Sequence, residues 1–401
     1  MAIDTIRFGS VIRDRCVWLL VCCAAIACSG NQETVGVANG AIVNGTNSTA
    51  AQDAVVFILG QTAQTEYDCT GTLLAPNLVL TARHCVSQVS EGIFVCDGSG
   101  QLGPGSTGGT VGADDPLASL SVFVGPNYPK LQMPDAKVTK LFHDDATILC
   151  SHDIALLLLD RKLPKATIAP VRLDSPTVVG ETFVAIGWGA TSATLTPQTR
   201  QQRSGISITH VGPETATSTT LPVPPGTFLA GESTCLGDSG APALSTTTGA
   251  LIGAVSGGSN LHPTQDPAAD CVGADAYTYF TEVAPFKSLI LQALNEAGQD
   301  PWLEGGGNPL LGKSGDACQM GTDCQGGTCA GSVCECNETS SPCPAPLLCT
   351  AVGTTHVCQA PAQSAGCAIG RSRSEVPLLP VVSLVLMIFL LRRRAARVGC
   401  S

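Results

Sequence analysis

The chain has 401 residues, more than one ordinary domain requires, and 44% of them are hydrophobic while only 13% are charged. Its formal net charge is −11, and residues 29–367 carry twelve basic against twenty-nine acidic side chains. Nucleic-acid binding requires a basic surface, so nucleic acid is excluded as an expected partner. Twenty cysteines, which cluster along the chain, indicate disulfides and export from the cell.

The N-terminal segment 1–28 has the pattern of a secretory signal. Three arginines precede an apolar run from Cys16 to Cys28, and the run contains Ala25-Ile26-Ala27, a small-x-small cleavage site. Cys28 follows this site directly and resembles the lipidated cysteine of bacterial lipoproteins. An ordinary signal peptide that happens to contain cysteines is the alternative. The short, polar segment 29–41 is interpreted as a propeptide.

Three apolar runs predict strands of the domain that follows. Val55–Gln61 and Leu73–Thr81 are rich in apolar and β-branched residues and are bounded by turn residues. Ile154–Leu159 is a continuous apolar run, which is typical of a buried central strand.

Asp153 begins the third run, at the edge of the core, where a buried carboxylate requires a partner. We expect His84, in Thr81-Ala82-Arg83-His84-Cys85, to be this partner, with Arg83 pointing outward. His152 is the alternative base, but its neighbours match no histidine motif. A metal site is a further alternative, and its ligand spacing fits no tight template; it would use His143, Asp144, Asp145 and His152.

Residues 97–116 are rich in Gly, Ser, Thr and Asp and lie between Cys96 and Cys150. This composition predicts a loop insertion at the surface. A loop that shapes substrate access is the alternative.

The hexapeptide 237–242, Gly-Asp-Ser-Gly-Ala-Pro, places Ser239 between glycines. Glycines allow a tight turn and the close approach of a substrate backbone. The turn can aim the N–H groups of Gly237 and Ser239 at the point where an oxyanion develops. The pattern therefore indicates a nucleophilic serine, for which His84 and Asp153 supply a base and an orienting carboxylate.

These motifs, in the order His, Asp, Ser over residues 42–298, resemble the trypsin/chymotrypsin family of serine endopeptidases, and Gly187-Trp188-Gly189 continues the similarity. The resemblance implies an all-β fold, a double six-stranded antiparallel β-barrel with a C-terminal helix. It implies that His84, Asp153 and Ser239 form a catalytic triad that cleaves proteins or peptides, without a cofactor or metal. It also implies an oxyanion hole made by Gly237 and Ser239.

The segment Ile42-Val43-Asn44-Gly45 resembles the mature N-terminus of the same family. By that resemblance, cleavage frees the α-amino group of Ile42, which pairs with Asp238. The bond to be cleaved follows Ala41, so the activator cleaves after a small residue, and self-cleavage fits this requirement. A plain strand start is the alternative.

The resemblance assigns the specificity pocket to Ser233, Ser256, Gly258 and Thr278. Ser233 carries no charge to compensate a buried cation, and Thr278 restricts depth, so we expect cleavage after small or medium apolar residues. Asp275 is the alternative, as a source of basic preference. The resemblance also implies two disulfides, and the two remaining cysteines of the domain then pair with each other: Cys69–Cys85, Cys235–Cys271 and Cys96–Cys150.

The segments after the protease domain have distinct compositions. The amphipathic pattern of Pro285–Gly298 predicts the helix that closes the domain. Residues 299–316, with three consecutive glycines, predict a linker. Residues 317–358 hold eight cysteines and few large apolar residues, which predicts a module stapled by disulfides of unassigned connectivity. We expect a rigid spacer, with a surface-binding module or a metal site as the alternatives.

The C-terminus combines the spacer 359–375, which contains Cys367, with the apolar run 376–391 and the basic tail 392–401. This order resembles bacterial C-terminal sorting tags of the Myxo-CTERM type, which implies cleavage and anchoring at Cys367. A retained transmembrane segment over 376–391 is the alternative. We expect a monomer at the bacterial cell surface or outer membrane, or one released from it. A catalytically silent, trypsin-like binding module is the competing function.

Overall fold

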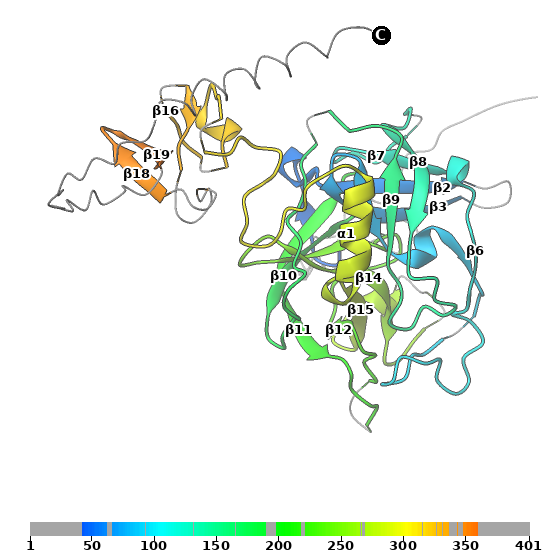
Figure 1. The fold of residues 1–401 in the computed structure, drawn as a ribbon. Coiled ribbons are helices and arrows are strands. Elements are labelled where there is room, and N and C mark those ends of the chain that lie inside the picture. The colour runs from blue at the N-terminus through cyan, green and yellow to red at the C-terminus, as the bar shows by residue number, and fades with distance from the viewer. Residues whose placement is uncertain are drawn as a thin grey trace, which may run out of the picture. The chain divides into compact units, whose positions relative to one another are not determined.

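The computed structural model describes residues 42–359, except 62–65, 93, 131, 165, 190–197, 218–220, 265, 267–268, 315, 326, 331, 337–342 and 344–347. The chain divides into two compact units between Pro309 and Leu310 (Figure 1). Within the described part of the chain, no helix is long and apolar enough to cross a membrane. The predicted signal, propeptide, sorting and transmembrane segments, with Cys28 and Cys367, lie outside the described residues.

Six antiparallel strands close the first barrel, in the order β2-β3-β4-β9-β8-β7. Its apolar side chains fill the interior because successive residues of a strand point to opposite faces. The strands are β2 (Val55–Gln61), β3 (Glu66–Ala75), β4 (Leu78–Thr81), β7 (Leu120–Phe123), β8 (Ala136–Phe142) and β9 (Ala155–Leu159).

The predicted single strand Leu73–Thr81 is wrong, because the run contains a turn. β3 ends at Ala75 and β4 begins at Leu78. Pro76 lies between them, and proline has no N–H group to donate to a sheet. The two strands pair antiparallel through Leu73 and Val79, so one apolar run supplies two neighbouring strands of the barrel.

The second barrel closes in the order β11-β10-β13-β14-β15-β12, with β12 pairing back to β11. The strands are β10 (Thr182–Gly187), β11 (Gln201–Val211), β12 (Thr227–Ala230), β13 (Pro242–Ser245), β14 (Leu251–Asn260) and β15 (Ala276–Glu282). Phe57 of β2 packs edge-on against Trp188, which follows β10, so the two barrels share a buried aromatic contact. The predicted fold class, two six-stranded barrels, is confirmed.

The first unit also contains shorter strands and 3-10 helices outside the two barrels. β1 pairs with β11, and β5 pairs with β6 to form a small hairpin. Their bounds are β1 (Thr46–Asn47), β5 (Ser87–Val89) and β6 (Val111–Asp114); the 3-10 helices are η1 (Ala50–Gln52), η2 (Arg83–Cys85), η3 (Leu117–Ser119), η4 (Ala269–Cys271) and η5 (Ala284–Phe286).

The predicted C-terminal helix is confirmed as α1 (Lys287–Glu296). Ile290, Ala293 and Leu294 are buried on its inner face. The helix ends at Glu296, and Gly298, two residues later, has a φ of 65°, a left-handed conformation that glycine adopts without steric cost.

Residues after α1 also belong to the first unit. Val171 N–H donates to the carbonyl of Trp302 at 2.8 Å, and Arg172 forms a two-pronged ion pair with Glu304 at 2.6 and 2.8 Å. The segment 299–316, expected as a linker, therefore straddles the division between the two units.

The described residues of the second unit hold four disulfides and two small hairpins. The disulfides are Cys318–Cys329, Cys324–Cys334, Cys336–Cys349 and Cys343–Cys358. The elements are η6 (Gly321–Asp323), β16 (Cys329–Ala330), β17 (Val333–Cys334), β18 (Leu348–Val352) and β19 (Thr355–Gln359). Thiolates are the metal-binding form of cysteine, and these eight sulfurs are all oxidised.

Candidate active site

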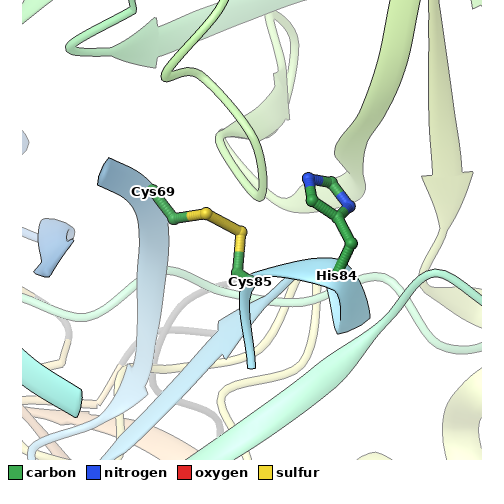
Figure 2. A group of neighbouring side chains, drawn as sticks. All are labelled: Cys69, His84 and Cys85. Carbon is green, nitrogen blue, oxygen red and sulfur yellow. A yellow bond between two sulfur atoms is a disulfide. The ribbon is translucent and has the colours of Figure 1, made fainter. Parts of the chain in front are cut away.

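Strand register brings His84 and Asp153 together. Thr81, the last residue of β4, pairs with Ala155, the first residue of β9. His84 follows on η2, and Asp153 lies two residues before β9, so both side chains lie at the same end of the first barrel. Figure 2 shows His84 and Cys85 on this short helix, with the disulfide from Cys85 to Cys69 beside the ring.

The Asp153 carboxylate is fully buried and accepts three hydrogen bonds. His84 donates to it twice, from its backbone N–H at 3.0 Å and from its ring through Nδ1 at 2.8 Å. The hydroxyl of Ser256 donates to the carboxylate at 2.7 Å. The ring is thereby fixed with Nδ1 toward Asp153, which leaves Nε2 as the nitrogen that can take a proton.

The environment of His84 favours its charged form. Burial lowers the pKa of the ring, but the negative charge of Asp153 and its hydrogen bond outweigh burial and raise the pKa above the usual 6.5. The side chain remains 23% exposed, so a substrate can reach it.

Asp238 organises the turn that carries Ser239. Its buried carboxylate accepts hydrogen bonds from the backbone N–H of Gly189 at 2.8 Å, of Cys235 at 3.0 Å and of Ile42. Burial raises the pKa of Asp238 to about 6, against the effect of these three bonds. The hydrogen bond from its N–H places Ile42 beside Asp238, and the Ile42 side chain is fully buried.

The positions around Ser239 and Asp238 require glycine, either because a side chain would clash with Asp238 or because the backbone is in the left-handed region. A Cβ on Gly187 or Gly189 would lie only 2.1 or 2.3 Å from an oxygen of the Asp238 carboxylate. Gly237 and Gly240 have φ angles of 94° and 76°, which side chains rarely adopt. The turn is anchored to the first barrel, where Thr70 N–H donates to the Ser239 carbonyl at 2.8 Å.

Two adjoining hollows surround these groups. The Ser239 cavity, of about 120 Å³, includes Ser239, Val255, Gly258, Asp270 and the Cys235–Cys271 disulfide in its lining. The His84 cleft, of about 570 Å³, is lined by His84, Ser256 and the segments Val89–Gly92, Phe94–Cys96 and Leu149–Ser151, with further residues of the second barrel. Gly257, Gly258, Ser259 and Tyr277 line both hollows.

The model of the family described as Trypsin matches residues 42–290, more than half of the chain. The chain belongs to the trypsin family. Membership of this family, together with the fold, supports a serine peptidase that acts on protein or peptide substrates. The disulfides of the trypsin domain are consistent with an extracellular protein.

The four residues that the family resemblance assigns to the specificity pocket do not all line one hollow of the trypsin domain. Gly258 lines the Ser239 cavity and Ser256 lines the His84 cleft. Ser233 is fully buried and does not line the Ser239 cavity. Thr278, also buried, accepts a hydrogen bond from the Thr234 hydroxyl at 3.2 Å and does not line the Ser239 cavity.

The acidic residue at the Ser239 cavity is Asp270, which the sequence did not single out. Asp275 is exposed and does not line the cavity. Asp270 directly precedes Cys271, whose disulfide to Cys235 draws it toward the serine turn. One carboxylate oxygen accepts the N–H of Thr264 at 2.7 Å.

Arg83 of the trypsin domain is buried, which corrects the expectation that it points outward. Its guanidinium donates to the Ser87 hydroxyl at 2.6 Å and pairs with Asp114 at 3.2 Å. Asp114 lies in the insertion 97–116, on β6. The insertion is therefore more than a surface loop, because it holds the residue next to His84 in place.

The histidines considered for a metal site contact separate carboxylates instead of converging on one point. His143 contacts Asp114 at 2.9 Å and Asp145 at 3.1 Å. His152 contacts Asp144 at 2.5 Å. In the described ranges, the groups close enough to hold an ion consist of disulfide cysteines, one of them with His84 (Figure 2).

Proposed function

We propose that this protein is a serine endopeptidase in which His84, Asp153 and Ser239 form the catalytic triad. The observation that carries the proposal is the 2.8 Å bond between His84 Nδ1 and the buried Asp153 carboxylate. This pair lies at a cleft that shares its lining with the Ser239 cavity.

In the proposed reaction, Ser239 Oγ attacks the peptide carbonyl while His84 Nε2 takes its proton. His84 then passes this proton to the leaving amine, and water releases the acyl group by the same steps in reverse. Asp153 holds the ring and stabilises its charged form, in line with the raised pKa of His84. The N–H groups of Gly237 and Ser239 bind the oxyanion, each worth about 10²–10³ in rate.

We also propose that cleavage after Ala41 activates the enzyme. In the uncleaved chain, the Ile42 nitrogen is an uncharged amide that donates to Asp238. Cleavage would convert this nitrogen into an ammonium group beside a buried carboxylate, and the resulting ion pair would stabilise the turn that carries Ser239.

For specificity, we propose cleavage after small or medium apolar residues. The Ser239 cavity is small, and Val255 and the Cys235–Cys271 disulfide provide apolar lining. The hydrogen bond from Thr264 N–H partly satisfies Asp270, the acidic group among the described residues of the lining. A panel of chromogenic peptides tests this proposal, and efficient cleavage after arginine that Asp270→Asn removes would contradict it.

We propose export and attachment of a monomer to the bacterial surface, on the basis of segments 1–28 and 359–401. Seven disulfides support export, since such bonds persist in oxidising compartments. Mass spectrometry of the surface-bound protein tests lipid at Cys28 or Cys367, and an intact segment 376–391 would instead establish a retained tail anchor.

A fluorophosphonate probe, applied to purified protein with a sequenced N-terminus, tests the catalytic proposal. We expect labelling when Ile42 is the N-terminal residue, complete loss of labelling in Ser239→Ala, and normal labelling in the control Ser175→Ala, which changes an exposed serine. Absence of labelling despite an Ile42 terminus would contradict the proposal and favour a binding role.

A further inference from the structure

We propose that Arg83 and Asp114 are positioning residues for the catalytic histidine. Their ion pair fixes the short helix η2, which carries His84, against strand β6 of the insertion 97–116, and so holds the His84 ring in line with Asp153. This inference rests on the proposed function, because it assigns two further residues to the same reaction.

The helix η2 has little stability of its own, although it carries His84. It is a single turn, Arg83–Cys85, and no side chain caps its N-terminus at Ala82. One isolated turn fixes several backbone angles for one hydrogen bond, so its formation is unfavourable without tertiary contacts. The disulfide from Cys85 to Cys69 holds the end of the turn (Figure 2). The contacts of Arg83 hold its beginning.

The Arg83 guanidinium belongs to a closed set of hydrogen bonds, and the residue is only 5% exposed. Its Nε donates to Ser87 Oγ at 2.6 Å, and its Nη2 pairs with Asp114 Oδ1 at 3.2 Å. The Ser87 hydroxyl donates to the same Asp114 oxygen at 2.7 Å. Because each of these three groups binds the other two, a shift of Arg83 would break two contacts at once and leave a buried cation without its partners.

Strand register brings Asp114 to this position. β5 begins at Ser87, two residues after η2, and pairs antiparallel with β6, where Asp114 lies opposite Ser87. Side chains of such cross-strand partners lie within reach of each other. The N–H of Asp115 donates to the Val86 carbonyl at 2.9 Å, and the Asp115 carboxylate accepts the Tyr67 hydroxyl at 2.5 Å. Backbone and side-chain bonds thus attach β6 to the segment that follows η2.

The second oxygen of the Asp114 carboxylate is also occupied. His143 Nε2 lies 2.9 Å from Asp114 Oδ2. Burial raises the pKa of Asp114, but the hydrogen bonds with Ser87 and His143 and the charge of Arg83 outweigh burial and lower the pKa below the usual 3.8. Asp114 is therefore ionised at the pH at which the reaction requires an unprotonated His84, and the ion pair persists there.

The ion pair acts on the reaction through the two bonds between His84 and Asp153. One comes from the His84 backbone N–H at 3.0 Å and the other from ring Nδ1 at 2.8 Å, so both depend on the orientation of η2. A rotated helix would lengthen them and change the direction of Nε2, and a misplacement of about 1 Å can cost about 10²-fold in rate. Neither Arg83 nor Asp114 lines the His84 cleft or the Ser239 cavity, so substrate binding should be preserved.

The processed full chain carrying Arg83→Met tests this role. Methionine is unbranched, like the arginine stem, but carries no charge. We measure kcat and KM for a chromogenic peptide with alanine before the scissile bond, and the pH dependence of kcat/KM. Rates are expressed per folded protein, whose fraction is read from urea unfolding. The positioning role predicts that kcat falls at least about tenfold, whereas KM changes less than about twofold.

The direction of the pH shift separates positioning from a direct effect of charge. Removing a cation next to His84 favours the protonated ring, and by itself moves the inflection of kcat/KM to higher pH. A weakened bond to Asp153 moves the inflection to lower pH, because this bond raises the pKa of His84. We expect the inflection of Arg83→Met to move to lower pH.

Three further variants complete the design. Asp114→Asn should lower kcat as Arg83→Met does, and the double variant should lose no more than the larger single effect, because the two residues act as one unit. Ser87→Ala leaves every charge in place and should move the inflection to lower pH to a smaller extent. The control Arg172→Met breaks another partly buried ion pair and should leave kcat and the inflection unchanged.

An Arg83→Met chain with unchanged kcat, or with an inflection at the same or a higher pH, would overturn the positioning role. If that chain does not fold, the same outcomes in Ser87→Ala overturn it. The proposed function is tested separately, because absence of fluorophosphonate labelling in the unmodified processed chain would contradict that function, and the positioning role with it, before any variant is compared.

Discussion

The buried carboxylate of Asp238 predicts that the uncleaved chain loses stability as the pH rises. In this form the Ile42 nitrogen is an amide, so three backbone N–H groups bind the carboxylate but no cation neutralises it. Burial raises the pKa of Asp238 from an ordinary 3.8 to about 6. The unfolded chain therefore releases this proton at a lower pH than the folded chain does.

The sign and size of the effect follow from these two pKa values. At about pH 3 the group is mostly protonated in both states, and at about pH 7 it is mostly ionised in both. Between them the folded state binds more protons, so its stability falls as the pH rises. Since a tenfold change in a proton-binding constant is worth about 1.4 kcal/mol, the total fall is about 3 kcal/mol.

Urea unfolding of the Ser239→Ala chain, which cannot cleave itself, measures this fall when compared with the same chain carrying Asp238→Asn. The substitution itself disturbs the hydrogen bonds at every pH, but only the carboxylate contributes the change between about pH 3 and about pH 7. The difference in unfolding free energy between the two proteins should shift by about 3 kcal/mol from about pH 3 to about pH 7. A difference that is independent of pH would refute the reasoning. Cleavage before Ile42 should remove the fall, because the new ammonium group pairs with the ionised carboxylate.

Three further predictions concern the active site and its cleft. The raised pKa of His84 predicts that kcat/KM rises with pH through a value above 6.5, and Asp153→Asn should move this inflection to lower pH; an unmoved pH profile would contradict the assigned partnership. Ser256→Ala removes a hydrogen bond to the Asp153 carboxylate and should lower kcat/KM by roughly tenfold or more in a peptide assay, whereas unchanged kinetics would show that the bond is dispensable. Replacing Cys96 and Cys150 together by serine opens a loop with a sequence separation of 54 and should cost roughly 4 kcal/mol in urea unfolding, and a loss below about 1 kcal/mol would indicate that the walls of the cleft are held without the disulfide.

Local patterns in the sequence predicted much of the fold. The apolar runs Val55–Gln61 and Ile154–Leu159 correspond to β2 and β9, and the amphipathic run before Gly298 forms α1. These signals depend on side-chain periodicity and on turn residues, which act over a few neighbouring positions. The same local view missed the turn at Pro76, because apolar residues on both sides of it continue without interruption.

The sequence also identified His84 and Asp153 as partners, and the family resemblance supplied the order of the motifs. The sequence did not reveal that Ser256 binds Asp153, which lies 103 positions away, or that Asp114 in the insertion pairs with Arg83. It pointed to Asp275 as the acidic group near the serine, although Asp270 lines that cavity.

The sequence by itself therefore determined which chemical groups the chain carries and which strands can present them, since both follow from residue type and short-range pattern. Only the tertiary structure decided which groups meet. Strand register, the path of each loop and the disulfides bring distant residues such as Ser256 and Asp153 to hydrogen-bonding distance. The His84 cleft has the same origin, because its lining comes from segments that lie far apart in the sequence.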